Sequence, residues 1–282
     1  MIGKAGARRI RLVESLWQSA APFEECLLQA GWNPRDFLSA APNVGFENTN
    51  NLGKGKKYSR LVVPRGGYMY PAYDLNHSYQ DCDAYVSLAK LKEHSTAGVT
   101  LSMKNSFGIT PNSIYGAGAG IDAPNESVRG FRQTFHAGDR QPSKSSPPEK
   151  DPASPREAGY RVPRVVVDLA LIRPIDLAVV DGVKTMTGGE GPWCKGPLGA
   201  VNPGVIAAGT NPVTTDAVCM AVMGFDPMAD RGTTPFEGCD STLRLAEDTG
   251  IGTRDLKRIE VIGTPIRTAM FDFAATRRQR RS

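Results

Sequence analysis

The sequence predicts an α/β fold, with a mixed, mainly parallel sheet flanked by helices in a single domain over residues 1–276. Two observations predict this class. Short apolar runs bounded by turn residues alternate along the chain with segments of helical periodicity. Hydrophobic residues make up 40% of the 282 residues and charged residues 22%, which suits a buried core and excludes disorder or a coiled coil for the whole chain.

The apolar runs that predict strands are short and are bounded by turn residues or polar sequence. They are residues 9–14, 61–63, 84–88, 175–180, 205–208 and 259–262. Residues 22–32 predict a helix, because Pro22 suits a first turn. A second helix is expected to run to about Met223, with Asn211 as its cap and Pro212 at its first position. Residues 165–172 fit either a strand or a helix.

One segment departs from this alternation of strands and helices. Residues 141–159 are rich in proline, serine and charge, and contain no aliphatic residue beyond two alanines. Because it has almost nothing apolar to bury, the segment predicts an exposed, mobile insertion. The favoured interpretation is a surface loop without a role in a site, and the alternative is a flap over the site described below.

The formal net charge of +5 lies at the two ends of the chain. Residues 1–60 carry +4, residues 61–276 carry −3, and residues 277–282, a basic tail with four arginines, carry +4. A nucleic-acid-binding protein is therefore not favoured, since it would need the tail to join the lysines of residues 54–57 in one basic face. We expect the tail to be a solvated terminus.

The five cysteines are widely spaced and form no Cys-x-x-Cys pair, so this chain is expected to hold no iron–sulfur cluster. Reduced thiols favour a cytoplasmic location, and Cys194 and Cys219 are expected to be inert rather than nucleophilic. No run of 18 apolar residues occurs and the first twenty residues lack an apolar signal core, so we expect neither a membrane span nor export.

His94 and Lys104 are the first candidate site residues. His94 follows the strand at residues 84–88, and Lys104 and Asn105 lie in a segment that can form a helix. His94 and Lys104 would then both lie near the sheet edge where open α/β sheets bind ligands. There His94 could act as a general base or metal ligand, and Lys104 as an anion clamp or an amine of lowered pKa. A structural histidine and a surface cation are the alternatives.

Asp181 and Asp216 are the second pair of candidates. Asp181 ends an apolar strand and precedes a glycine-dense loop, residues 187–199, while Asp216 lies in the second turn of the helix that opens near residue 211. Together they could bind a divalent metal such as Mg²⁺ or Ca²⁺, and a contribution from His94 would favour Zn, Mn or Fe. The alternatives are a turn cap for Asp181 and a helix-dipole role for Asp216.

A series of motifs occurs in a defined order over roughly residues 5–263. The motifs are Lys-Leu-Lys-Glu-His at 90–94, Val-Thr-Leu-Ser-Met-Lys-Asn-Ser-Phe-Gly at 99–108, Asp-Gly at 181–182 with Gly-Pro at 191–192, Asn-Pro-Val-Thr-Thr-Asp-Ala at 211–217 and Ile-Glu-Val-Ile-Gly at 259–263. This combination resembles the bacterial and archaeal family named domain of unknown function 362. The resemblance implies a fold and a site but assigns no reaction.

The chain departs from the family pattern in two places. Family members usually begin with an earlier strand that carries a Lys-Pro-Asn motif, whereas this chain starts at Met-Ile-Gly. The departure predicts either a sheet without that element or a natural start further upstream. Some relatives carry a ferredoxin-like segment with clustered cysteines, which this sequence lacks, so a self-contained electron-transfer role is not expected.

We therefore expect a pocket at the carboxyl ends of the strands. It would be lined by His94, Lys104, Asn105, Asp181 and Asp216. The leading hypothesis is a small-molecule enzyme acting on an anionic substrate, with Lys104 holding the anion, His94 as acid/base, and the aspartates binding a metal or orienting the base. The alternative is a non-catalytic binding or accessory protein for a redox or cofactor-assembly system, which an exposed apolar patch would favour.

Overall fold

The computed structural model describes residues 1–16, 21–50, 52, 55–118, 131–191, 193–194 and 198–276. The strands are β1 (Ile10–Glu14), β2 (Val44–Asn48), β3 (Ser59–Val62), β4 (Ala72–Leu75), β5 (Val86–Lys90), β6 (Lys92–His94), β7 (Gly98–Thr100), β8 (Leu177–Gly182), β9 (Thr185–Thr187), β10 (Gly199–Val201) and β11 (Val205–Gly209). The helices are α1 (Phe23–Gln29), α2 (Pro34–Leu38), α3 (Ser78–Asp81), α4 (Ser102–Asn105), α5 (Asn112–Tyr115), α6 (Gln133–His136), α7 (Ala158–Ile172), α8 (Pro212–Val222), α9 (Thr242–Asp248) and α10 (Ile266–Ala269). The basic tail, residues 277–282, lies outside the described residues, as does Lys54.

The fold is α/β, and its sheets are small and mixed. In the three-stranded sheet β8 lies between β5, to which it is parallel, and β11, to which it is antiparallel. The pair β1·β2 is parallel, whereas β3·β4, β6·β7 and β9·β10 are antiparallel. A mainly parallel sheet, which the sequence predicted, is therefore not seen among the described strands.

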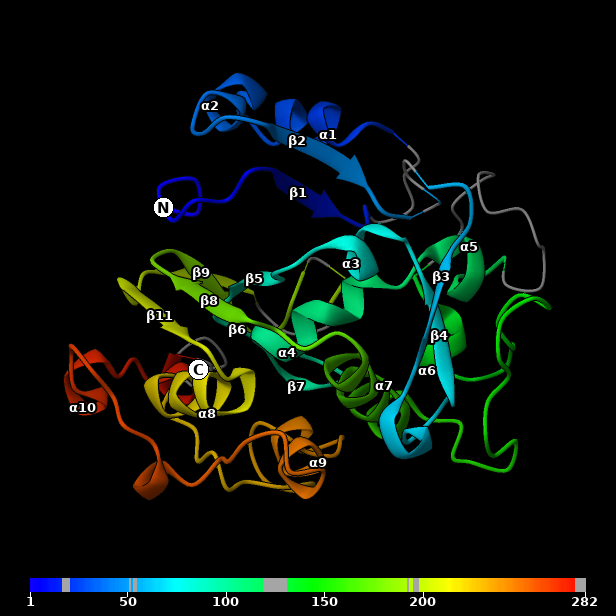
Figure 1. Ribbon diagram of the computed structural model, residues 1–282. Coiled ribbons are helices and arrows are strands. Elements are labelled where there is room, and N and C mark those ends of the chain that lie inside the picture. Colours follow the sequence, from blue (N-terminus) through cyan, green and yellow to red (C-terminus); the bar gives the residue numbers. More distant parts are fainter. Residues whose placement is uncertain are drawn as a thin grey trace.

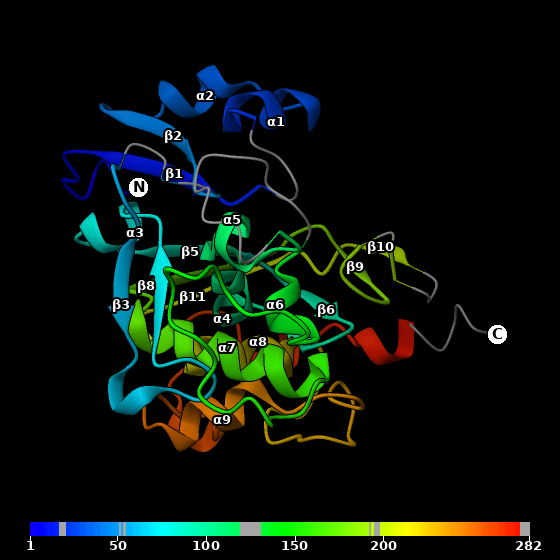
Figure 2. The ribbon, with the colours of Figure 1, turned by 90° about the vertical axis from the view of Figure 1, so that its right-hand side faces the viewer.

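Helices cover one face of the three-stranded sheet. In Figure 1 and Figure 2, α7, α8 and α9 lie on one side of β8 and β11, and β1, β2, α1 and α2 lie on the opposite side. Side chains alternate between the faces, so Ala178 and Val180 of β8 are buried while Leu88 of β5 and Ile206 of β11 are 63% and 66% exposed. The covered face joins a cluster of buried hydrophobic residues that reaches from Val63 to Phe273.

Most of the predicted helices and strands are found. In two segments the structure decides or corrects the prediction. Residues 165–172 belong to the helix α7, whose Val162, Val166 and Leu169 are fully buried at helical spacing. Residues 259–262 form no strand, and Ile262 is 89% exposed. The predicted strand was wrong because an apolar run becomes a strand only when a neighbouring edge pairs with it.

No helix among the described residues combines the length and the apolar content needed to cross a membrane.

The start of α8 follows the sequence prediction closely. The Asn211 Oδ1 atom accepts a hydrogen bond from the backbone N–H of Thr214 at 3.0 Å, and its amide donates to the carbonyl of Ile251 at 2.7 Å. The cap therefore serves two purposes: it satisfies a free helix N–H, and it ties α8 to the loop after α9.

Replacing this cap, Asn211→Ala, is expected to lower the free energy of unfolding by about 2 kcal/mol, because both hydrogen bonds are lost. Asn33→Ala is the matched control, since Asn33 is an exposed cap whose Oδ1 accepts from Arg35 N at 3.1 Å and whose amide donates only within the same turn, to Asp36 at 3.4 Å. Its expected cost is about 0.5 kcal/mol. Urea unfolding of both variants measures the difference, and equal costs would contradict a double role for Asn211.

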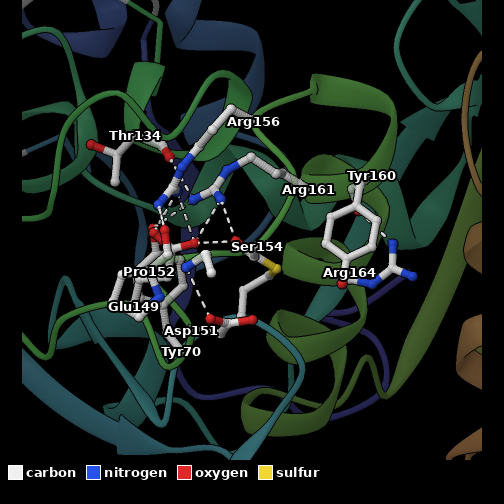
Figure 3. Close-up of polar contacts among 12 residues, drawn as sticks. Tyr70, Thr134, Glu149, Asp151, Pro152, Ser154, Arg156, Tyr160, Arg161 and Arg164 are labelled. Carbon is white, nitrogen blue, oxygen red and sulfur yellow. Dashed lines mark hydrogen bonds and ion pairs between the residues drawn. The ribbon is translucent and has the colours of Figure 1, made fainter.

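The segment at residues 141–159 packs against the body of the protein through polar side chains. Glu149 is buried, and its two oxygens lie 2.7 Å from Arg161 Nη1 and 2.7 Å from Arg156 Nη1 (Figure 3). Ser154 donates a further hydrogen bond to Glu149 and accepts one from Arg161 at 2.9 Å. The sequence prediction counted only aliphatic residues. It therefore did not anticipate that the segment buries polar side chains in this ion-pair cluster.

The first turns of α7 contain a proline. Pro163 lacks an N–H, so the carbonyl of Gly159 has no helical donor. That carbonyl instead accepts from the backbone N–H of Asp240 at 3.0 Å. Residue 159 must be a glycine, because a Cβ atom there would clash with the carbonyl oxygen of Gly238.

Candidate functional site

The hairpin β6·β7 and the short helix α4 position His94 and Lys104. His94 is the last residue of β6, and Lys104 follows β7 as the third residue of α4. The Ser87 hydroxyl of β5 donates to the carbonyl of Ser102 at 3.1 Å, and the Asn105 amide donates to Ser87 Oγ at 3.1 Å. Asn105 therefore attaches α4 to the edge of the three-stranded sheet.

Asp216 caps α4 from a distant part of the sequence. Its Oδ1 accepts from Ser102 N at 2.9 Å and Ser102 Oγ at 2.6 Å, and its Oδ2 accepts from Met103 N at 3.0 Å. Burial raises the pKa of this carboxyl group to about 6, although the hydrogen bonds oppose the rise. Asp216 thus holds the backbone immediately before Lys104, and both of its oxygens are already used.

The Lys104 amine lies 4.2 Å from the ring centroid of Phe107. Within the described part of the chain it makes no hydrogen bond and no ion pair. Burial, and next the charge of Arg132, lower the pKa of the Lys104 amine to about 7. Near neutral pH, a large fraction of the Lys104 side chains is therefore uncharged.

Arg132 shares the Phe107 ring with Lys104. Its guanidinium carbon lies 6.0 Å from the ring centroid, and it donates to the carbonyls of Thr110, at 2.9 Å, and Gly108, at 2.7 Å. Burial lowers the pKa of Arg132 to about 10. Although Glu14 acts on Arg132 electrostatically, no ion pair of Arg132 is found in the described ranges.

Glu190 is the carboxylate nearest to His94. It accepts from Ser95 N and Ser95 Oγ, each at 2.8 Å, and from the Trp193 indole at 3.1 Å. Burial opposes its ionisation, but the charge of a protonated His94 and these donors together lower the pKa of Glu190 to about 2. The Cys194 thiol also donates to Glu190, at 3.3 Å. Glu190 is therefore ionised and fully occupied by local donors.

The two histidines of the site are neutral at physiological pH. The backbone N–H of Thr96 donates to His94 Nδ1 at 3.1 Å, so the proton of neutral His94 lies on Nε2. Burial and then Lys104 hold the pKa of His94 well below its usual range, so its Nδ1, 4.0 Å from Glu190, carries no charge. Burial likewise lowers the pKa of His136, whose ring lies 5.5 Å from that of Phe107, to about 4.

Asp181 has different partners from the other candidates. Its carboxylate accepts from Lys90 Nζ at 2.6 Å and from Val183 N at 2.9 Å. These contacts lie on the face of the three-stranded sheet that α7, α8 and α9 do not cover, here called the uncovered face. Asp216, in contrast, is buried against α4. Among the described residues no group of three His, Cys, Asp or Glu side chains could hold a metal ion. The metal assignment to the two aspartates stays a prediction, with no ligand set to support it.

The structure thus places Lys104 close enough to His94 for the lysine charge to lower the pKa of the histidine. Three site residues were missed by sequence reasoning: Arg132, His136 and Glu190. Glu190 lies in the glycine-dense loop already considered important, and that loop was the available signal. Arg132 and His136 belong to no motif, and the chain fold alone brings them to Phe107.

A cavity of about 920 Å³ lies elsewhere, between β11, α8 and residues 259–271. None of the five predicted site residues lines it. Two of the family-like motifs do, because Asn211, Thr214 and Thr215 form one wall and residues 259–263 another. These motifs therefore have a place in the fold that is separate from the cationic site at Phe107.

Together the fold and the site define an α/β protein in which a buried arginine and a partly buried lysine lie against one aromatic ring. The chain belongs to the family described as domain of unknown function (DUF362), whose family model matches residues 1–221. The match includes every site residue named above and ends before the motif at residues 259–263. Comparisons with curated proteins and with solved structures give no match.

Proposed function

We propose that this protein binds a small anionic molecule between Lys104 and Arg132 and acts on it as an enzyme. The observation that supports the proposal is the pair of largely buried cations at Phe107, neither of which makes an ion pair in the described ranges. A buried charge without a counter-charge is costly, by several kcal/mol. An anionic ligand would provide the missing charge, since Glu190 is already occupied by Ser95 and Trp193.

In the proposed site each polar group has a defined role. Arg132 binds the anion, because its planar guanidinium suits carboxylate or phosphate oxygens. Lys104 binds the anion when protonated and accepts a proton when neutral. His94 donates a hydrogen bond to the bound molecule through its Nε2–H group. Asp216 and Asn105 are positioning residues, which hold α4 and hence Lys104 in place.

A non-catalytic binding or accessory protein is the second candidate. The uncovered face of the three-stranded sheet favours it, because Leu88 and Ile206 are exposed there, on either side of the Lys90–Asp181 ion pair. This candidate predicts a protein partner on that face and no binding of small anions at Phe107.

Calorimetric titration with inorganic phosphate and with pyruvate, two simple anionic probes, tests the proposed site. Lys104→Met and Arg132→Gln are each expected to weaken binding of at least one probe about tenfold or more, because each removes a charge-assisted contact. Binding should also take up protons near pH 7.5, since a nearby anion raises the pKa of Lys104. Repeating the titration in buffers of different ionisation enthalpy measures this uptake.

Lys90→Met is the matched control for the loss of one lysine charge. Its amine pairs with Asp181 and a carbonyl on the sheet face, so binding of either probe should not change. No binding of either probe by the wild-type protein, or equal losses in Lys90→Met and Lys104→Met, would contradict the proposed site. Thermal unfolding of each variant shows that the comparison is made between folded proteins.

A further inference from the structure

We propose that Lys104 is a nucleophile that forms an imine with the carbonyl carbon of a small 2-oxo acid, whose carboxylate is bound by Arg132. The inference rests on the proposed anion site and specifies its substrate class. Three features support it: a Lys104 amine that makes no hydrogen bond to the described residues, an Arg132 near it that makes no ion pair with them, and a neutral histidine close to Lys104.

The state of the Lys104 amine suits nucleophilic attack, which needs a free lone pair. An ordinary lysine has a pKa near 10.4, so only about one amine in a thousand is neutral near pH 7.4. Burial and the neighbouring Arg132 lower the pKa of Lys104 to about 7, which makes the neutral amine abundant. A lysine in an apolar site beside another cation is a recognised form of activated nucleophile.

Arg132 matches the other half of a 2-oxo acid. In these compounds the carboxylate is bonded directly to the carbonyl carbon, so a cation for the carboxylate must lie next to the nucleophile. Lys104 and Arg132 contact the same ring, at 4.2 Å and 6.0 Å from the Phe107 centroid, and the charge of Arg132 lowers the pKa of Lys104, so the two side chains lie near each other. Arg132 Nε and Nη2 bond to Thr110 and Gly108, and Nη1 makes no hydrogen bond to the described residues.

The reaction balances without an oxidant or reductant. The Lys104 nitrogen attacks the carbonyl carbon, and the carbonyl oxygen takes a proton to give a carbinolamine. The proton that the oxygen takes comes, by way of water, from the Lys104 nitrogen, which keeps one N–H in the neutral carbinolamine. The hydroxyl group then takes a proton from solvent and leaves as water while the nitrogen lone pair forms the C=N bond, and the last N–H proton returns to solvent. His94 is not the acid or base of this step, because its Nδ1 accepts from Thr96 N–H; its Nε2–H group donates a hydrogen bond to the carbonyl oxygen.

Lys92 provides an internal comparison for Lys104. Burial lowers the pKa of Lys92 as well, but its amine donates to the carbonyl of Glu190 at 3.1 Å. This hydrogen bond holds the Lys92 amine at that carbonyl group, so the amine is less free to attack a substrate than the Lys104 amine is. Imine formation is expected at Lys104 and not at Lys92.

Trapping with pyruvate and sodium cyanoborohydride at pH 7.5 tests the inference. Intact-protein mass spectrometry should show one reduced pyruvate adduct, and peptide mapping should place it on Lys104. Lys104→Met should lose the adduct and Lys92→Met should keep it. Lactate, which has the carboxylate but no carbonyl group, should give none.

Arg132→Gln tests the carboxylate contact separately. It should slow trapping of pyruvate about tenfold or more, and slow trapping of acetone, which has no carboxylate, by a clearly smaller factor, which reflects only the higher pKa of Lys104 without the Arg132 charge. Equal effects on both compounds would show that Arg132 acts only on the amine. If pyruvate binds in the calorimeter but no adduct forms at Lys104, the imine is wrong and the anion site stands. If neither pyruvate nor phosphate binds and no adduct forms, both proposals fail.

Discussion

Glu149→Gln is expected to lower the free energy of unfolding by about 3 kcal/mol, because it leaves a fully buried arginine without its counter-charge. Glu149 Oε1 lies 2.7 Å from Arg161 Nη1, and Arg161 is 0% exposed. The same carboxylate pairs with Arg156 and accepts from Ser154 (Figure 3). It also accepts from the Gln141 amide at 3.0 Å. A glutamine side chain would keep the size of Glu149, but its amide N–H group would face the guanidinium group of Arg161 or of Arg156.

Glu157→Gln is the matched control for this substitution. Glu157 pairs with Arg231 at 2.6 Å, but the two side chains are 51% and 38% exposed, so the expected cost is below about 1 kcal/mol. Urea unfolding at pH 7 measures both values. A cost for Glu149→Gln no larger than that for Glu157→Gln would show that the segment at residues 141–159 is not held by this cluster.

The pH dependence of the same variant follows from the lowered pKa of Glu149. Burial favours the neutral form of Glu149, but the hydrogen bonds of Arg161 and Arg156 hold its pKa at about 2. A carboxyl group with a lowered pKa contributes its full stabilisation above the unfolded value of about 4.5, and loses it as the pH falls toward 2. The deficit of Glu149→Gln should therefore stay constant from pH 7 to about 5.

Asp216→Ala is expected to have the second large effect, on both stability and the site. Removing the carboxylate leaves Ser102 N, Ser102 Oγ and Met103 N without acceptors in a buried position, at a cost of about 3 kcal/mol or more. The start of α4 then loses its anchor. Binding of the anionic probes and trapping of pyruvate at Lys104 should fall about tenfold or more, since misplacement of a reacting group is costly.

Asp168→Ala separates the two effects. Asp168 is also a buried carboxylate that accepts from backbone N–H groups, those of Met69 at 2.9 Å and Tyr70 at 3.3 Å, and from the Tyr73 hydroxyl at 2.9 Å. It should cost a similar amount of stability without a loss of probe binding at Lys104. Equal losses of binding in both variants would contradict a specific positioning role for Asp216.

The two carboxyl groups should respond to pH in opposite directions. Burial raises the pKa of Asp216 to about 6, so the folded protein binds this proton more tightly than the unfolded chain does. The contribution of Asp216 to stability therefore falls as the pH rises from about 4 through 6. The deficit of Asp216→Ala should shrink over this range, whereas that of Glu149→Gln should not.

Local signals in the sequence predicted the parts of the fold that depend on neighbouring residues. The Asn211 cap and the helix after it were found because the cap, the proline and the helix are adjacent in sequence. Residues 259–262 have the composition of a strand but no partner edge, and that absence is a property of the tertiary fold. Local pattern therefore predicts segments better than it predicts their pairing.

The same distinction applies to the candidate site. Lys104 and His94 were predicted because they follow a strand within a short stretch of sequence. Asp216 was predicted to bind a metal, with a helix-dipole role as the alternative; the structure shows that it caps α4, a contact that no local pattern indicates. Arg132 comes from a separate segment and meets Lys104 only through Phe107, so only the folded chain identifies it.

Pro163 gives α7 a connection that an all-hydrogen-bonded helix would not have. The proline leaves the Gly159 carbonyl free to accept from Asp240 N, and residue 159 must lack a side chain because the Gly238 carbonyl lies against it. The start of α7 and the loop before α9 therefore constrain each other. A substitution in either of them changes what the other can tolerate. In sequences of relatives, the proline, the glycine at the position of Gly159 and the loop before α9 should accordingly be kept together or be replaced together.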